Sequence, residues 1–185
     1  MWYEVESKIK INDYNLVKKE VRRIANFKKK DKKTDKYFAL HINGYPKRAF
    51  RIRFEGKKYI VNFKNKIDRL GDGISVVKEE FEFSLGSDEE MNNFLSLCKN
   101  LGFKEWIDKK KINETYCYKK NKKLSIELNK VEHLGNWMEI EYLGQRKEIS
   151  KAKKIIKDVL SQIKRGLGEV NNTGYTKMLY ARRSS

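Results

Sequence analysis

The sequence predicts an α+β fold in which an antiparallel sheet or barrel has helices packed on its outside. Short runs with the two-residue alternation of strands fill most of the chain, beginning with WYEVESKIKI at residues 2–11. Three segments, near 13–27, 87–101 and 147–165, instead show the helical spacing of apolar residues. The order is strand, helix, several strands, helix, several strands, helix. That order gives two loosely similar halves and favours antiparallel pairing.

The first strand is followed directly by a helix, for which Asp13 suits the N-cap position. Its apolar face consists of Val17, Val21, Ile24 and Phe27. The lysine-rich run at 28–33 predicts a solvated loop, with a rim that attracts phosphate as the alternative.

Further strands are expected at 35–42, 49–54, 58–66 and 76–85, separated by turns that contain glycine or the single proline. Ser87 and Glu90 form a capping box for the second helix, and Gly102 suits its end. Strand patterns return at 103–107, 114–120, 124–131 and 137–143 before the last helix, which Gly166 ends.

Length and composition place limits on the kind of protein. The 185 residues fit one domain, and the net charge of +18 implies an anionic partner: nucleic acid, a phosphorylated small molecule or an acidic membrane. Neither a signal peptide nor a membrane-spanning run is apparent, and the two cysteines form no metal or disulfide pattern. We therefore expect a cytoplasmic protein that does not enter a membrane.

Five of the expected strands each carry two like charges at positions i and i+2. These pairs are Glu4 with Glu6, Arg51 with Arg53, Lys64 with Lys66, Glu80 with Glu82, and Glu139 with Glu141. Such side chains point to one face about 6.5–7 Å apart. At an effective dielectric constant near 20 their repulsion is about 2.4 kcal/mol. The abundance of charged residues explains one such pair, but five in matching contexts favour faces that line a polar interior. There, carboxylates would gather divalent cations and basic pairs would gather a polyanion.

Several motifs, in order along nearly the whole chain, resemble those of the CYTH superfamily, the triphosphate tunnel metalloenzymes. EVESK matches the ExExK signature, FRIRF the R-x-R strand, KYIVNFKNK the lysine-bearing strand and KEEFEF the central E-x-E. IELNKVEHLGNWMEIEY and GYTKML are similar to the late motifs of class IV (CyaB-type) adenylyl cyclases. The resemblance implies a closed or nearly closed antiparallel barrel of about eight strands, a tunnel that holds a triphosphate. This domain would span residues 1–170, and 171–185 would hold a tunnel-capping GYTKML motif and a flexible tail.

The resemblance also implies roles for individual residues. Metal ligands would be Glu4, Glu6, Glu80, Glu82, Glu127, Asn129, Glu139 and Glu141. Triphosphate contacts would be Lys8, Arg51, Arg53, Lys64, Lys66 and Lys111. Catalysis would rest on Glu4, Glu6, Lys8, Glu139 and Glu141, with two Mg²⁺ or Mn²⁺ ions.

Two positions depart from the family's pattern. Asn129 stands where the family usually has a metal-binding aspartate, and Asn113 stands where it usually has an arginine. One negative and one positive charge are lost together, which puts metal affinity and catalytic competence in question.

The implied activity is conversion of ATP to cyclic AMP and pyrophosphate. The alternatives are a thiamine or inorganic triphosphatase, a catalytically impaired triphosphate-binding module, and a protein that binds or processes the 5′-triphosphate of RNA. The partner would be a nucleoside triphosphate or another triphosphate, and the protein a monomer or homodimer.

Overall fold

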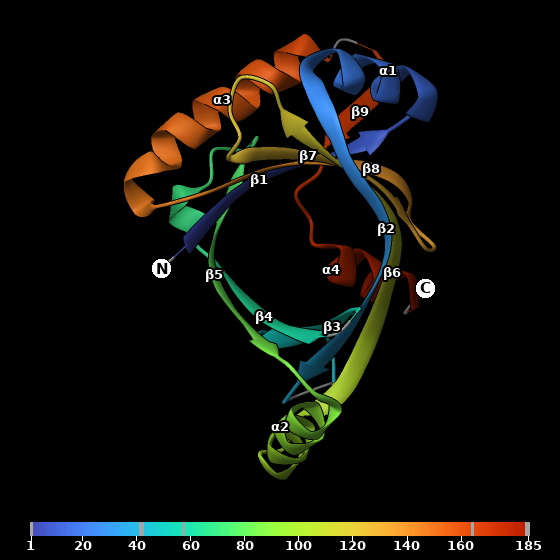
Figure 1. Ribbon diagram of the computed structural model, residues 1–185, viewed down its shortest axis with the longest axis vertical. Helices are drawn as coiled ribbons and strands as arrows, with labels where there is room; N and C mark the ends of the chain where they lie inside the picture. Colours follow the sequence, from blue (N-terminus) through green and yellow to red (C-terminus); the bar gives the residue numbers. More distant parts are fainter. Residues whose placement is uncertain (1, 41–42, 57, 164, 184–185) are drawn as a thin grey trace. The chain divides into compact units, whose positions relative to one another are not determined.

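The computed structural model describes residues 2–40, 43–56, 58–163 and 165–183 (Figure 1). Within these ranges the strands are β1 (Trp2–Ile11), β2 (Ala25–Ala39), β3 (Ala49–Glu55), β4 (Lys58–Lys66), β5 (Val76–Leu85), β6 (Lys104–Tyr118), β7 (Leu124–Val131), β8 (Gly135–Gly144) and β9 (Leu167–Val170). The α-helices are α1 (Tyr14–Ile24), α2 (Asp88–Asn100), α3 (Ile149–Gln162) and α4 (Tyr175–Arg183), and short 3-10 turns occupy Asp68–Leu70 and Arg146–Glu148.

All the strands belong to one sheet, in the order β5-β4-β3-β2-β6-β7-β8-β1-β9. β1 also pairs with β5, from Trp2 opposite Glu80 to Glu6 opposite Val76, so the hydrogen-bonded circuit closes over eight strands. β9 continues along the same edge of β1, near Ile9 and Ile11. The predicted α+β fold, a closed antiparallel barrel with helices outside, is confirmed.

The chain forms two compact units, which we describe separately. The first unit comprises Met1–Lys32, Asn65–Glu80 and Lys111–Thr173. The second unit comprises Lys33–Lys64, Phe81–Lys110 and Gly174–Ser185. The prediction of a single domain over 1–170 is not tested by this division and stays a prediction.

In the first unit, helices α1 and α3 pack on one face of the strands, and α3 lies alongside β1 and β8 (Figure 1). Alternate strand residues such as Val5, Ile126 and Ile140 point to these helices and are buried with Val17 and Ile156. Because strand side chains alternate, the intervening residues lie on the opposite face. That opposite face carries the acidic residues considered below.

The second unit has its own smaller core. Phe38, Ile52 and Val61 on β2, β3 and β4 pack with Met91 of α2, and Phe50 joins them at the edge. The intervening residues of these strands again form a polar face.

The lysine-rich run at 28–33, predicted to be a loop, is instead part of the 15-residue strand β2. Phe27 consequently lies on this strand and is exposed, and does not close the face of α1. Lysines tolerate an exposed strand because their charged ends reach water, and Lys29 also pairs with Asp31 at 2.8 Å. Residues 41–42 of the expected strand 35–42 lie outside the described residues.

A further expectation needs correction. The strand patterns at 103–107 and 114–120 belong to one continuous strand, β6, because its middle residues also pair with β7. The C-terminal segment contains α4, in which Tyr175 and Leu179 of the GYTKML motif are buried, and the flexible tail stays a prediction. β9 was not predicted, since four residues around two glycines give little alternation.

Gly166 offers a stability test of the junction between β1 and α1. Its carbonyl accepts the backbone N–H groups of Asn12 and Asp13 at 2.8 and 3.0 Å, and its φ is +81°. A Cβ there would lie 2.8 Å from the Asp13 carbonyl oxygen. Gly73 has the same φ but nothing within 4 Å of its Cβ position.

We expect Gly73→Ala to lower the free energy of unfolding by about 1–2 kcal/mol, the cost of left-handed backbone for a residue with a Cβ. Gly166→Ala should lose a further 1–3 kcal/mol or so through overpacking. Urea denaturation of the two variants measures the difference, and equal losses would contradict the close approach.

Candidate metal and phosphate site

Five glutamates from three neighbouring strands of the first unit lie on the polar face of the sheet. They are Glu4 and Glu6 of β1, Glu127 of β7, and Glu139 and Glu141 of β8. We refer to these five residues as the glutamate cluster. Strand register places Glu6 directly opposite Glu141, and Glu127 directly opposite Glu139. Like charges directly opposite each other destabilise a sheet, so this arrangement does not serve the stability of the strands.

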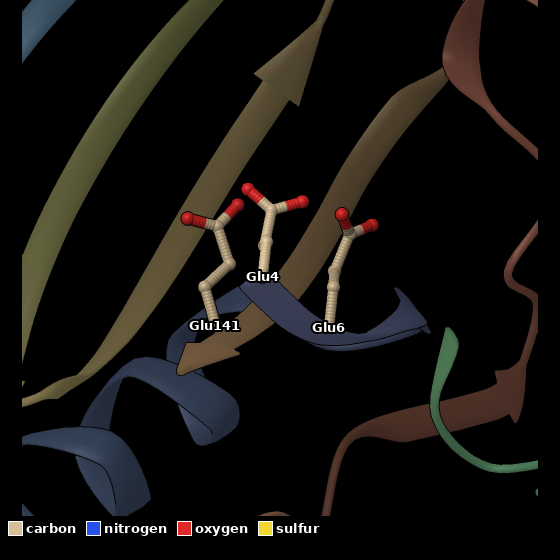
Figure 2. A group of neighbouring side chains, drawn as sticks. All are labelled: Glu4, Glu6 and Glu141. Atoms are coloured by element: carbon tan, nitrogen blue, oxygen red, sulfur yellow. The ribbon is translucent and has the colours of Figure 1, made fainter. Parts of the chain in front are cut away.

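The carboxylates of the glutamate cluster converge in two groups that share Glu141. In each group, Glu4–Glu6–Glu141 and Glu127–Glu139–Glu141, one oxygen from each residue lies within 4.8 Å of the others. Figure 2 shows the first group, with the three carboxylates side by side and pointing in the same direction. At 4.8 Å and an effective dielectric constant near 20, two carboxylates repel each other by about 3.5 kcal/mol. A nearby cation is therefore needed.

Two lysines each bridge two of these carboxylates. Lys78 of β5 donates to Glu4 Oε1 at 3.2 Å and makes a short contact with Glu6. Lys111 of β6 donates to Glu127 Oε2 at 2.9 Å and to Glu139 Oε2 at 3.4 Å. Lys111 was predicted from the sequence to contact a triphosphate. Lys78 was not singled out, although it shares the face of Glu80 and Glu82.

The lysines and carboxylates shift one another's ionisation. Burial opposes the charged form of Lys78, but the carboxylates of Glu6 and Glu4 outweigh it and raise its pKa. The pKa of Lys111 is raised in the same way by Glu127 and Glu139. Burial raises the pKa of Glu6, and the neighbouring Glu139 adds to this effect while Lys78 opposes it.

Lys8, which is 2% exposed and lies opposite Glu139, adds a third ammonium group to those of Lys78 and Lys111. Three ammonium groups thus stand among the five carboxylates of the glutamate cluster. Carboxylate oxygens are the ligands that Mg²⁺ and Mn²⁺ prefer, so the donor set fits a divalent cation.

Asn113 and Asn129 are opposite each other on β6 and β7 and have no exposed surface. Asn113 Nδ2 donates to Asn129 Oδ1 at 2.7 Å, and Asn129 Nδ2 donates to Glu139 Oε2, also at 2.7 Å. Thr115 Oγ1 donates to Asn113 Oδ1 at 2.8 Å. This chain of bonds fixes both amide orientations, because a flipped Asn129 would turn its oxygen toward the carboxylate of Glu139. The two departures from the family's pattern are therefore hydrogen-bonded partners.

The second unit contains a basic counterpart around Asp35 of β2, which has no exposed surface. Arg53 Nε and Nη2 donate to its two oxygens at 2.5 and 3.0 Å. Lys109 Nζ lies 2.8 Å and Arg51 Nη1 3.5 Å from Asp35 Oδ2. We refer to these four residues as the Asp35 cluster. Burial raises the pKa of Asp35, but Lys109, Arg51 and Arg53 together outweigh it and hold that pKa well below its usual range.

Other predicted site residues are not members of the glutamate cluster. Lys66 is 2.6 Å from Asp68 at an exposed position. Glu82, also exposed, accepts from Asn62 within the second unit, where Lys64 also lies. Glu80, in the first unit, is not a member of either carboxylate group. Asp35 and Lys109 were not predicted as site residues, because each is a single charge on its strand. Only their contacts with neighbouring strands identify them.

Solved structures with the same fold were found, although no protein-family model and no curated protein matches the chain. The PH1819 protein of Pyrococcus horikoshii is 27% identical, with a TM-score of 0.75 over 97% of this chain and 99% of that one. A "putative adenylate cyclase" of Vibrio parahaemolyticus is 13% identical, with a TM-score of 0.70 over 96% and 97% of the two chains. A Hippeastrum protein, HpAC1, is 15% identical, with a TM-score of 0.64 over 100% and 97%. It is described as a "putative adenylyl cyclase" with a dominant triphosphatase activity.

The chain thus shares the fold of these solved structures, two of which are described as putative adenylate or adenylyl cyclases. Within the described residues no helix is both long and apolar enough to cross a membrane.

The amide pair gives a prediction on buried charge. Asn129→Asp alone would add a carboxylate beside Glu139, and Asn113→Arg alone would bury a guanidinium opposite an amide. An uncompensated buried charge costs about 3–5 kcal/mol, so each single variant should lower the free energy of unfolding by an amount of that order.

The double variant should lose less than the sum of the single variants, by about 1–3 kcal/mol, because the new charges face each other. Urea denaturation in EDTA measures this coupling. Millimolar Mg²⁺ should restore more stability to Asn129→Asp than to the wild type. Strict additivity would show that the two positions act independently.

Asp35 gives a prediction on pH. Asp35→Asn should cost about 3–5 kcal/mol at pH 7, since it leaves buried cations without their carboxylate. The folded-state pKa of Asp35 is lowered, so its contribution is complete above its unfolded pKa near 3.9 and is lost as pH falls through the folded value. The stability difference between wild type and variant should therefore be constant above about pH 4 and shrink below it. Asp68→Asn, at an exposed position, is the control for urea denaturation across this range, and a gap that stays unchanged in acid would refute the assignment.

Proposed function

We propose that the protein is a metal-dependent enzyme that binds a triphosphate and catalyses nucleotidyl or phosphoryl transfer. The observation that carries the proposal is the glutamate cluster, in which four buried carboxylates and the half-buried Glu141 converge from three strands and lie directly opposite one another. A sheet gains nothing from this arrangement unless a cation is bound.

Glu4, Glu6 and Glu141 would hold one Mg²⁺ or Mn²⁺, and Glu127 and Glu139 with Glu141 offer ligands for a second. A bound ion of this kind supplies charge neutralisation and a bridge to phosphate oxygens. In this proposal, Asn129 is not the metal ligand that the family resemblance implied. Its amide oxygen is taken by Asn113, and its N–H group holds the carboxylate of Glu139 in place.

The lysines of the first unit would act on the phosphates. Lys8, Lys78 and Lys111 are held among carboxylates, and each ammonium group can donate three hydrogen bonds. With the carboxylates occupied by a cation, these donors would be available to bind phosphate oxygens. A triphosphate offers several such oxygens.

The first candidate reaction is that of an adenylyl cyclase. The ribose 3′-oxygen of ATP forms a bond to the α-phosphorus, the bond from that phosphorus to the β-phosphate oxygen breaks, and the hydroxyl proton leaves to a carboxylate or water. Cyclic AMP and pyrophosphate result. The LGNWMEIEY and GYTKML segments, which are similar to the CyaB-type pattern, favour this reaction.

The second candidate is a triphosphatase, in which water attacks the γ-phosphorus and releases inorganic phosphate. The specific support is the Hippeastrum protein of the same fold, described with a dominant triphosphatase activity. The two reactions need the same charges around the triphosphate and differ in the nucleophile, so product analysis separates them.

The test uses the purified protein with ATP, thiamine triphosphate and tripolyphosphate, each with Mg²⁺ or Mn²⁺, and resolves the products. We expect turnover of at least one substrate, abolished by EDTA. Glu141→Gln should lower turnover by about 100-fold or more, because Glu141 belongs to both carboxylate groups.

Glu132→Gln is the matched control, at an exposed position in the turn between β7 and β8, and it should retain turnover. Tight binding without turnover of any substrate would overturn the enzymatic proposal and leave the triphosphate-binding module. Full activity in EDTA would overturn the role of the metal.

A further inference from the structure

Basic residues are concentrated in two segments of the first unit, residues 18–32 and 119–123. Together these segments contain twelve lysines and arginines but only two acidic residues, a net charge of +10 out of +18 for the whole chain. They cover the second half of α1, the start of β2 and the turn between β6 and β7. A charge concentrated in this way attracts polyanions.

Two hydrogen bonds bring the two segments together. Lys119 donates its backbone N–H to the carbonyl of Ile24 at 3.1 Å and its Nζ to the carbonyl of Arg23 at 2.9 Å. Ile24 is the last residue of α1, and β2 begins at Ala25, so the turn lies against the point where β2 begins. The lysines of the turn and the first lysines of β2 therefore lie on adjacent segments.

Five lysines of these segments are exposed. Lys28, Lys30 and Lys32 occupy every second position of β2, so they point to one side of the strand about 6.5–7 Å apart. Lys120 and Lys122 are exposed on the turn. We refer to these five residues as the basic strip. A row of cations at regular spacing suits a linear polyanion, whose charges are also regularly spaced.

An exposed aromatic ring lies next to the basic strip. Phe27 precedes Lys28 on β2 and is 54% exposed, and its ring meets that of Tyr116 edge-on, with 5.5 Å between the ring centres. Tyr116 also donates to Glu114 at 2.7 Å, and Lys30 Nζ lies 3.8 Å from the same carboxylate. Phe27 and Lys30 thus share neighbours on β6. Cations beside an exposed ring suit a single-stranded nucleic acid, in which lysines contact phosphates and a base stacks on the ring.

An acidic membrane would also attract the basic strip, but the apolar contacts favour a nucleic acid. A peripheral helix binds a membrane by inserting its apolar face. The apolar face of α1, which consists of Val17, Val21 and Ile24, is buried in the core of the first unit.

We propose that the basic strip and Phe27 form a binding surface for single-stranded nucleic acid. The lysines contact phosphates of the backbone, and Phe27 stacks with one base. RNA and single-stranded DNA share this chemistry, so both enter the test. The interaction needs neither a metal nor the glutamate cluster, and it goes beyond the proposed function.

The test is fluorescence anisotropy of the whole protein with a labelled RNA of about 12 nucleotides, the DNA of the same sequence and the corresponding DNA duplex. All have 5′-hydroxyl ends and are measured in EDTA, so that neither a triphosphate nor a metal contributes. We expect both single strands to bind more tightly than the duplex, whose bases are already stacked on one another. A duplex that binds as tightly as the single strands would overturn the proposal.

The lysines are tested together. Combining Lys28→Gln, Lys32→Gln and Lys120→Gln should weaken single-strand binding by about 10-fold or more. The slope of log K against log salt should become shallower by about 2, because each phosphate contact contributes about 0.7.

The matched control combines Lys58→Gln, Lys99→Gln and Lys104→Gln, which removes the same charge from exposed lysines of the second unit. It should change affinity less than about twofold. Equal losses from the two triple variants would overturn the basic strip and attribute binding to net charge alone.

Phe27 tests the stacking contact. Phe27→Leu should weaken single-strand binding by about 5-fold or more and leave duplex binding unchanged, whereas Phe27→Tyr, which keeps a ring, should retain affinity. A Phe27→Leu variant with wild-type affinity for single strands would refute stacking. Urea denaturation of each variant shows whether it is folded, and the three lysines are exposed positions at which glutamine is tolerated.

Vesicles of phosphatidylcholine and phosphatidylserine test the membrane alternative. Sedimentation of the protein with these vesicles, without binding of either single strand, would overturn the proposal. Turnover of a triphosphate by a protein that binds no oligonucleotide would also sink this inference alone. Conversely, single-strand binding that depends on the basic strip, with no turnover of any triphosphate in Mg²⁺ or Mn²⁺, would sink the enzymatic proposal and support this one.

Discussion

The opposition of carboxylates across β8 is the constraint on which the first unit depends. Glu141 faces Glu6 on one side, and Glu139 faces Glu127 on the other. The register that creates these contacts is fixed by the other face of the same strands, where Val5, Ile126 and Ile140 are buried against α1 and α3. A slip by one residue would bury the glutamates under the helices. Hydrophobic packing on one face therefore holds the carboxylates close together on the other face, although they repel each other.

The two units pair their buried charges in the same way but with opposite signs. In the first unit lysines pair with a group of carboxylates, and in the second Asp35 pairs with a group of cations. In each case the less numerous charge makes the defined contacts, as Lys78 does between Glu4 and Glu6. In the proposed function, these contacts order the site and the more numerous charge attracts a ligand of opposite sign. An ion pair with no excess would order the side chains equally well but would give no preference for a bound ion.

The sequence predicted site residues best where both members of a like-charged pair lie on the same strand. The pairs Glu4 with Glu6 and Glu139 with Glu141 could be read from alternation alone, because position i+2 is always on the same face. Lys78, Asp35 and Lys109 could not be read in this way, since each is a single charge whose partners lie on other strands. Their contacts depend on the register between strands, and the local sequence pattern does not predict that register. The same limit applies to β2, where six residues of nearly uniform charge contain no alternation, and only pairing with neighbouring strands makes them a strand.

The Asn113–Asn129 pair shows how a site can change two residues and keep its charge. An arginine and an aspartate opposite each other contribute no net charge, and two asparagines contribute none either, so the net charge around the glutamate cluster does not depend on which pair is present. The need for a cation is thus retained. What changes is the set of possible ligands. An aspartate could offer an oxygen to the ion, whereas the side-chain oxygen of Asn129 accepts a hydrogen bond from Asn113 and its N–H group donates one to Glu139. In the proposed function, cation binding would then fall to the glutamates, and the amide pair would influence it through the orientation of Glu139.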